Sequence, residues 1–158
     1  MTPCIDILNS MGVSHEIHRY AHDPSSELSY GLEASEKLGV EPSRIFKILI
    51  VDLGSSKYGV AMIPVSSQLN LKQMGCAVSA AKKPSMVNID LVKKITGYYP
   101  GAVSPIGQKK QLVQVIDSSA ELFSTIFVSA GKRGLEIELS ASDLIKITGS
   151  KVFIIGSK

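Results

Sequence analysis

The sequence is poor in aromatic residues and in cysteine. Its 158 residues include no tryptophan, only 4 phenylalanines, 5 tyrosines and 2 cysteines. With so few rings, the core must consist mostly of isoleucine, valine and leucine, which suits β-sheets. Cys4 and Cys76 lie far apart in the chain, which excludes a disulfide framework and a zinc knuckle. So few cysteines fit a reducing compartment.

Segments for membrane insertion or export are also missing. No stretch approaches the roughly 18 apolar residues that a membrane-spanning helix needs. The first residues, Met1 to Asp6, lack the basic and apolar regions of a signal peptide. We therefore expect a cytoplasmic protein with no membrane partner.

The common signatures of nucleotide binding and nucleophilic catalysis are absent. The chain has no G-x-x-x-x-G-K-[ST] loop, no G-x-G-x-x-G loop and no G-x-S-x-G elbow. On a strand, His15 and His18 would point to opposite faces, which argues against a shared metal ion. Cys76 has no activating base near it in the sequence. We expect no metal site, no cofactor and no Ser–His–acid triad.

Length and composition predict one domain over residues 1–158, with one sizeable core. The 44% hydrophobic and 20% charged residues are ordinary for a globular protein. The formal net charge of +3 is mildly basic, so it permits contact with a polyanion without requiring one. Much of the positive charge comes in pairs that fit solvated turns, at residues 82–83, 93–94, 109–110 and 132–133.

Helix and strand patterns are interspersed along the chain. Caps and apolar spacing predict helices after Thr2, Asn70, Asn88 and Ser140, another over 32–38, and a short helical turn at 118–121. Strands are predicted at 15–20, 44–53, 58–65, 111–116, 125–129, 135–139 and 151–155. Because strict βαβ alternation is missing, we expect an α+β domain with a mixed or antiparallel sheet.

The segment Gly101 to Lys110 is the most distinctive part of the chain. Gly101, Pro105 and Gly107 fall close together in it, which predicts a rigid loop with bare backbone that a ligand can approach closely. The loop contains no acid, histidine or cysteine. An active site there would work through shape and backbone dipoles.

Lys47 stands out because it interrupts an apolar strand. Alternation places it on one face with Ile45 and Leu49. A lysine there either snorkels outward, protects a sheet edge or reaches into a cleft. In a cleft, its ammonium would suit a phosphate or a carboxylate.

Three further features have an ordinary interpretation and a functional one. The glycine-rich turn at 129–136 carries Lys132 and Arg133, and its ordinary interpretation is a β-hairpin. Tyr20 and Tyr30 are more typical of a core, although a tyrosine at a cleft can stack on a terminal base.

Together these segments resemble the YbaK family of aminoacyl-tRNA deacylases, whose fold also forms the editing insertion of bacterial prolyl-tRNA synthetases. The resemblance runs nearly end to end and depends on the order and spacing of short pieces, at residues 1–3, 31–34, 46–49, 69–72, 96–98, 101–110 and 128–139. It implies a single α+β domain around a mixed, partly barrel-like sheet flanked by helices.

The resemblance also implies a function: removal of cysteine mischarged onto tRNA(Pro), beside prolyl-tRNA synthetase and with no DNA partner. The implied mechanism needs no enzyme nucleophile, because the substrate's thiol attacks its own ester carbonyl and leaves as a cyclic thiolactone. Orientation supplies roughly 7–11 kcal/mol in favourable intramolecular reactions. A backbone donor to the oxyanion adds about 3–4 kcal/mol.

The site residues follow from the resemblance position by position. The implied catalytic positions are Lys47 and Gly101. The implied substrate-binding positions are Tyr20, Tyr30, Ile48, Ala102, Ser104, Pro105, Gly107, Ser129 and Glu136. Two of them depart from many relatives, since Ile48 replaces a threonine and Ala102 replaces a glycine. If position 102 requires a positive φ, alanine is strained there.

Two alternative functions stay open. Ile48 makes the pocket more apolar, which favours a sibling enzyme that removes another amino acid, such as alanine from Ala-tRNA(Pro). The mild positive charge also fits a non-catalytic module that binds tRNA or a synthetase with salt-sensitive affinity.

Overall fold

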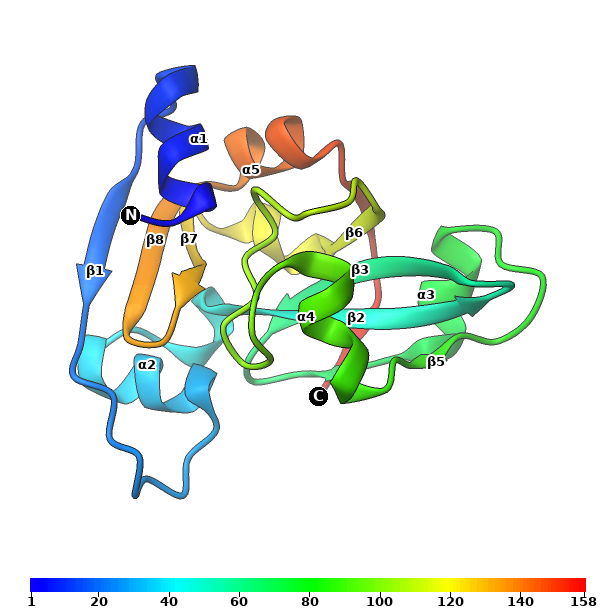
Figure 1. The fold of residues 1–158 in the computed structure, drawn as a ribbon, viewed down its shortest axis with the longest axis horizontal. Coiled ribbons are helices and arrows are strands. Elements are labelled where there is room, and N and C mark those ends of the chain that lie inside the picture. The colour runs from blue at the N-terminus through cyan, green and yellow to red at the C-terminus, as the bar shows by residue number, and fades with distance from the viewer.

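The computed structural model describes residues 1–158 and distributes the strands over three sheets, with helices packed around them (Figure 1). The largest sheet is mixed. Its strand order is β5 (Ser85–Met86), β2 (Phe46–Gly54), β3 (Lys57–Pro64), β6 (Val113–Asp117) and β9 (Lys151–Phe153). β2 and β3 form an antiparallel hairpin, whereas β3, β6 and β9 run parallel.

A second sheet of three antiparallel strands lies beside β2, in the order β1 (Glu16–Arg19), β8 (Leu135–Ser140) and β7 (Thr125–Lys132). A parallel bridge between Ile45 and Phe127 joins it to the start of β2. The third sheet pairs β4 (Gln68–Leu69) with β10 (Gly156–Ser157). The α+β class and the mixed sheet are confirmed, but the strands do not close into a barrel.

The helices begin and end where capping chemistry places them. The Thr2 hydroxyl accepts from the Ile5 N–H at 3.3 Å and starts α1 (Pro3–Met11), which Gly12 ends at φ +66°. Asn70 starts α3 (Leu71–Ala77), and Ser140 starts α5 (Ala141–Thr148). α2 (Tyr30–Leu38) begins two residues before the predicted start, because Ser29 caps it. None of the helices is long and apolar enough to cross a membrane.

Several local predictions differ from the structure. Asn88 caps a 3₁₀ segment, η2 (Ile89–Leu91), and α4 (Val92–Thr96) follows it separately. The helical turn η3 (Ser118–Leu122) is capped by Asp117, and a further 3₁₀ turn, η1 (Pro42–Arg44), precedes β2. The strands β4, β5 and β10 have only two residues each, too few for a sequence period to reveal.

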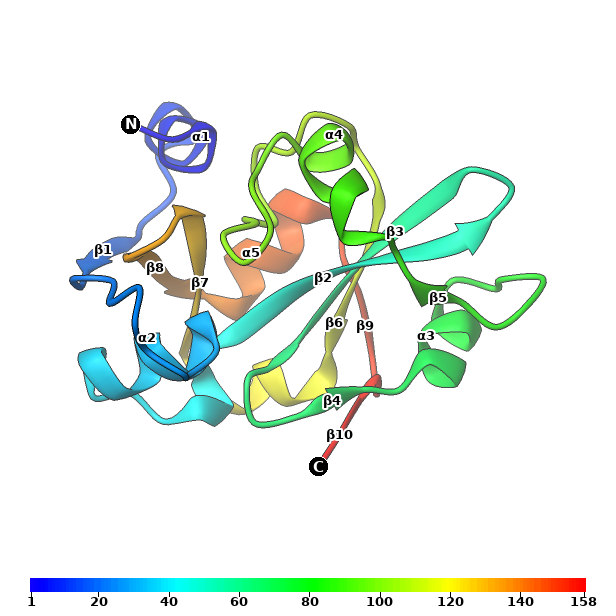
Figure 2. The ribbon, with the colours of Figure 1, turned by 60° about the horizontal axis from the view of Figure 1, so that its bottom comes forward.

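The main core lies between the two larger sheets, under α1 and α5. It is a cluster of 21 buried residues in which aliphatic side chains predominate, as the shortage of rings requires. At one end of this core, α2, the start of β2 and the loop after α4 all approach the β7–β8 hairpin (Figure 2).

Candidate functional site

A pocket of about 250 Å³ lies where α2, β2, the loop after α4 and the β7–β8 hairpin meet. The structure brings together many of the residues that the resemblance singled out, because its lining includes Tyr20, Tyr30, Lys47, Ile48, Gly101, Ser129 and Glu136. It places the other four outside the lining: Ala102, Ser104, Pro105 and Gly107. No histidine or cysteine lines the pocket.

Lys47 reaches this pocket from β2, where it is paired with Ile63 of β3. Its side chain is half-buried and forms no hydrogen bond or ion pair within the protein. Burial lowers the pKa of the Lys47 ammonium below its usual value. An ammonium without a partner in a partly apolar pocket can bind a phosphate, a carboxylate or an ester oxygen.

Glu136 is an acidic group in the same pocket whose carboxyl has no partner. It lies on β8 opposite Ser129, is only 7% exposed, and its carboxyl forms no hydrogen bond. Burial raises the pKa of its carboxyl from 4.5 to about 8, so the group is mostly protonated at neutral pH. A buried neutral acid and an unpaired ammonium in one cleft are typical of a functional site.

Glu136→Gln is expected to flatten the pH dependence of stability. The folded protein keeps a proton on Glu136 up to about pH 8, whereas the unfolded chain releases it near 4.5. The contribution of Glu136 to the free energy of unfolding is therefore full below about 4.5 and lost as the pH rises through 8. Glutamine does not ionise. Urea unfolding should show the variant gaining on the wild type between pH 5 and pH 9, and an equal difference at both pH values would contradict this.

Gly101 presents its backbone to the pocket at φ +81°. A Cβ atom there would lie 2.1 Å from the Tyr30 ring, so the ring and the glycine fit only because position 101 has no side chain. The N–H groups of Gly101 and Val103 have no acceptor within the protein. They are therefore free to donate to a ligand oxygen.

Ala102 is accommodated without backbone strain. Its φ is not positive, and its N–H donates to the Tyr99 carbonyl at 3.0 Å. The expectation that an alanine there might be strained therefore does not apply, and this N–H is not available to a ligand.

The middle of the loop is buried and held by hydrogen bonds from side chains. The Tyr98 hydroxyl donates to the Ile106 carbonyl at 2.7 Å. The Gln108 and Gln114 amides donate to the carbonyls of Ser104 and Pro105, each at 3.0 Å. These hydrogen bonds fasten the loop from Ser104 to Ile106, and within the loop only Gly101 and Val103 line the pocket. The residues from Ala102 to Ile106 are buried.

Gly101→Ala is expected to lower any activity of this pocket by about 100-fold, because displacement of Tyr30 would misplace a bound molecule by about an ångström. Gly12→Ala is the matched control. Gly12 also has a positive φ, +66°, but an added Cβ there meets nothing within 4 Å. Both variants should lose stability from the positive φ, Gly101→Ala more so because of the clash with Tyr30, and only Gly101→Ala should lose activity. Equal activity in the two variants would remove the role of the Gly101–Tyr30 contact.

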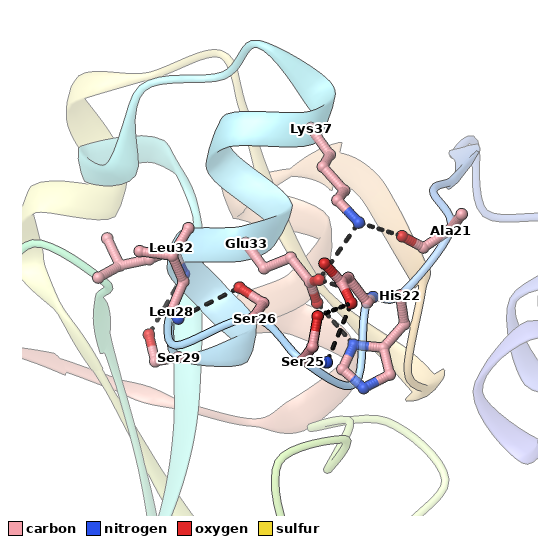
Figure 3. Close-up of polar contacts among 10 residues, drawn as sticks. Ala21, His22, Ser25, Ser26, Leu28, Ser29, Leu32, Glu33 and Lys37 are labelled. Carbon is pink, nitrogen blue, oxygen red and sulfur yellow. Dashed lines mark hydrogen bonds and ion pairs between the residues drawn. The ribbon is translucent and has the colours of Figure 1, made fainter.

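A buried carboxylate holds the segment that leads into Tyr30 (Figure 3). Glu33 is 1% exposed and accepts from His22 Nδ1 at 2.7 Å and from the Asp23 N–H at 2.9 Å. Lys37 Nζ lies 3.3 Å from the same carboxylate and also donates to the Ala21 carbonyl. Burial alone would raise the pKa of Glu33, but these partners more than offset it and hold the pKa below its usual value.

This Glu33 cluster positions the pocket wall. The His22 ring meets the Tyr30 ring edge-on, with centroids 5.3 Å apart. The Arg133 guanidinium lies over the same Tyr30 ring, 4.4 Å from its centre. Sequence reasoning assigned no role to Glu33, because nothing in a linear pattern shows that a helix residue folds back onto the loop before it.

Sequence reasoning also missed the pocket role of Lys132 and Arg133. Their segment is the predicted β-hairpin, but both side chains line the pocket. The sequence signal that could have revealed this role is the presence of two cations beside glycines in one turn. The turn's Gly131 and Gly134 both have positive φ.

The histidines lie outside the pocket. His15 contacts the Val13 carbonyl at 2.7 Å. His18 lies with Glu16 and Glu138, and their ligand atoms are all within 4.8 Å of one another. Glu138 is already engaged by Thr125 and by Arg44, whose Nη2 lies 3.5 Å away.

The fold and the pocket together define an α+β domain with a cleft that contains a lysine and a buried carboxyl but no histidine or cysteine. The model of the "Aminoacyl-tRNA editing domain" matches residues 29–147. The chain belongs to this family.

Relatives agree with this assignment. The chain is 39% identical over 124 residues, 78% of its length and 75% of the other's, to "Putative Cys-tRNA(Pro)/Cys-tRNA(Cys) deacylase EbsC" of Enterococcus faecalis (strain ATCC 700802 / V583). It is 29% identical to "Uncharacterized protein YwhH" of Bacillus subtilis (strain 168), over 77% of this chain and 76% of that protein. A solved "putative trans-editing enzyme for prolyl tRNA synthetase" shares the fold, with a TM-score of 0.83 at 18% identity, over 99% of this chain and 98% of that one.

Proposed function

We propose that this editing domain deacylates Cys-tRNA(Pro) in trans. One observation carries the proposal: Lys47, Gly101 and Val103 line one pocket that has no histidine or cysteine, and the N–H groups of Gly101 and Val103 have no acceptor within the protein. Such a site can bind and orient an ester but supplies no thiol or imidazole nucleophile. The relative named as a Cys-tRNA(Pro)/Cys-tRNA(Cys) deacylase supports cysteine as the amino acid.

In the proposed reaction the substrate provides its own nucleophile. Its cysteine sulfur bonds to the ester carbon, the bond from that carbon to the ribose oxygen breaks, and the thiol proton passes to the ribose oxygen. The products are a cyclic thiolactone and free tRNA. Lys47 holds the 3′-end of the tRNA, and the Gly101 N–H stabilises the developing oxyanion. Orientation is the largest contribution, roughly 7–11 kcal/mol in favourable cases.

A panel of charged tRNAs tests this function. The wild-type protein should release cysteine from tRNA(Pro) well above the spontaneous rate and should leave proline on the same tRNA. The deacylation rate of Cys-tRNA(Cys) shows how strongly the enzyme depends on the tRNA body. If no ester on the panel is lost faster than the spontaneous rate, deacylation is wrong and a non-catalytic binding module becomes the better explanation.

A second candidate is deacylation of Ala-tRNA(Pro), which Ile48 favours because its apolar side chain lines the pocket. One methylene in such a pocket changes binding by only about 1–3 kcal/mol, so selectivity by size alone is modest. Substrate chemistry discriminates more sharply. S-methylation of the cysteinyl ester should stop a thiol-assisted enzyme and leave an alanine-type enzyme unaffected.

We extend the proposal to the partner and the location. Prolyl-tRNA synthetase would supply the mischarged tRNA, and both proteins would work in the cytoplasm. Addition of the synthetase should raise the deacylation rate at low tRNA concentration, where delivery is limiting.

A further inference from the structure

A second hollow, of about 310 Å³, opens beside the pocket. It is formed by the first residues of the chain, the end of β1 and the turn between β7 and β8. The two cavities share Tyr20, Lys132 and Arg133 in their linings, so they adjoin each other. Their junction is held tightly, because the Tyr20 N–H donates to the Gly134 carbonyl at 3.0 Å. A Cβ on Gly134 would lie 2.5 Å from the backbone carbonyl oxygen of Tyr20.

This second hollow has positive charges that no carboxylate neutralises. Arg19, Lys132 and Arg133 line it, all three are exposed, and none forms an ion pair. The polar contact of the Arg19 guanidinium is with the Met1 sulfur at 3.9 Å. No acidic residue lines the hollow.

Two cations elsewhere in the chain are paired with carboxylates. Arg44 lies 3.5 Å from Glu138, and Lys37 lies 3.3 Å from Glu33. Three cations gathered in one concavity without an acid raise the local concentration of anions. Arginine and lysine in such a place suit phosphate oxygens.

We propose that the Arg19–Lys132–Arg133 hollow binds the phosphodiester on the 5′ side of the nucleotide whose aminoacyl ester enters the pocket. The proposal rests on the proposed function, which places that ester beside Lys47 and Gly101. The terminal ribose carries both the ester and this phosphodiester, so the phosphate must lie within one nucleotide of the ester. The adjoining hollow is at that place and has the complementary charge. Phosphate contacts of this kind fix register and carry no sequence information.

The test separates phosphate binding from ester cleavage. The first measurement is equilibrium binding of a 5′-labelled trinucleotide, cytidylyl-cytidylyl-adenosine, at several salt concentrations. The second compares kcat/KM for Cys-tRNA(Pro) with kcat/KM for cysteinyl-adenosine, which has no phosphate. Both use the wild type, R19Q, K132Q and the control K57Q. Lys57 is exposed, forms no ion pair and lies at the start of β3, away from both cavities.

R19Q should weaken trinucleotide binding about tenfold, since one charge-assisted contact is lost. It should also reduce the slope of log affinity against log salt by about 0.7. The ratio of kcat/KM for the tRNA ester over the adenosine ester should fall by a similar factor in R19Q and K132Q but not in K57Q.

Two outcomes would overturn the phosphate site. Either R19Q binds the trinucleotide with the wild-type affinity and salt slope, or its loss of trinucleotide affinity is no larger than the loss in K57Q. Failure of the proposed function would look different. The wild type would then cleave neither ester, while the trinucleotide measurement would still decide whether the hollow binds phosphate.

Discussion

Replacement of Lys47 by methionine is expected to lower kcat/KM for Cys-tRNA(Pro) by about 100-fold, because loss of the ammonium that holds the tRNA 3′-end misplaces the ester. The free energy of unfolding should stay unchanged or rise. Burial holds the pKa of Lys47 below its usual value, so the folded protein bears a cost for keeping the ammonium in the pocket at neutral pH. Methionine keeps most of the length and the apolar character of the lysine stem and removes that cost.

The expected loss of activity without a loss of stability makes the Lys47→Met result diagnostic. A residue needed only for folding would lose activity and stability together. Deacylation rates and guanidinium unfolding at pH 7 should be measured on the same preparations, with Lys57→Met as the control for loss of an exposed lysine on the neighbouring strand. Wild-type turnover by Lys47→Met would remove Lys47 from the mechanism.

Glu33→Ala is expected to lower the free energy of unfolding by about 3 kcal/mol, as the breaking of buried charge networks does. The substitution leaves the Asp23 N–H, His22 and Lys37 without their shared acceptor. The segment from Ala21 to Ser29 should loosen, and the hold on Tyr30 should loosen with it. Denaturant unfolding measures the first effect, and an increase in KM for Cys-tRNA(Pro) measures the second.

Glu36→Ala is the matched control for Glu33→Ala, because Glu36 lies on the same helix but is exposed and forms no ion pair. Its substitution should change stability by only a few tenths of a kcal/mol. A similarly small effect in Glu33→Ala would show that the network contributes little to the fold. A large loss of stability with an unchanged KM would separate Glu33 from the pocket.

Much of the fold could be predicted because it depends on neighbouring residues. Thr2, Asn70 and Ser140 cap helices with their own side chains, so the signal lies within four positions of each helix start. The β2–β3 hairpin was predictable in the same way. Its central residues, Ser55 and Ser56, form the turn with positive φ.

The site was less predictable because its geometry depends on residues far apart in the chain. Lys47 and Gly101 were singled out from the sequence, and both line the pocket. The burial of Ser104 and Pro105 was not foreseen, because Gln108 and Gln114 fasten that part of the loop and no local pattern encodes these contacts. Nor does any local pattern show that Arg19 lies beside Lys132.

The dispersed origin of the pocket has a consequence for how the protein acquires activity. Its walls come from Tyr20, Lys47, Gly101 and Glu136, which meet only after β1, β2 and β8 have all come together. Closing such long loops is entropically costly and slow. A partly folded chain therefore lacks the complete pocket. Ester cleavage should reappear only with the last kinetic phase of refolding, so the rate at which activity returns reports when the native topology is complete.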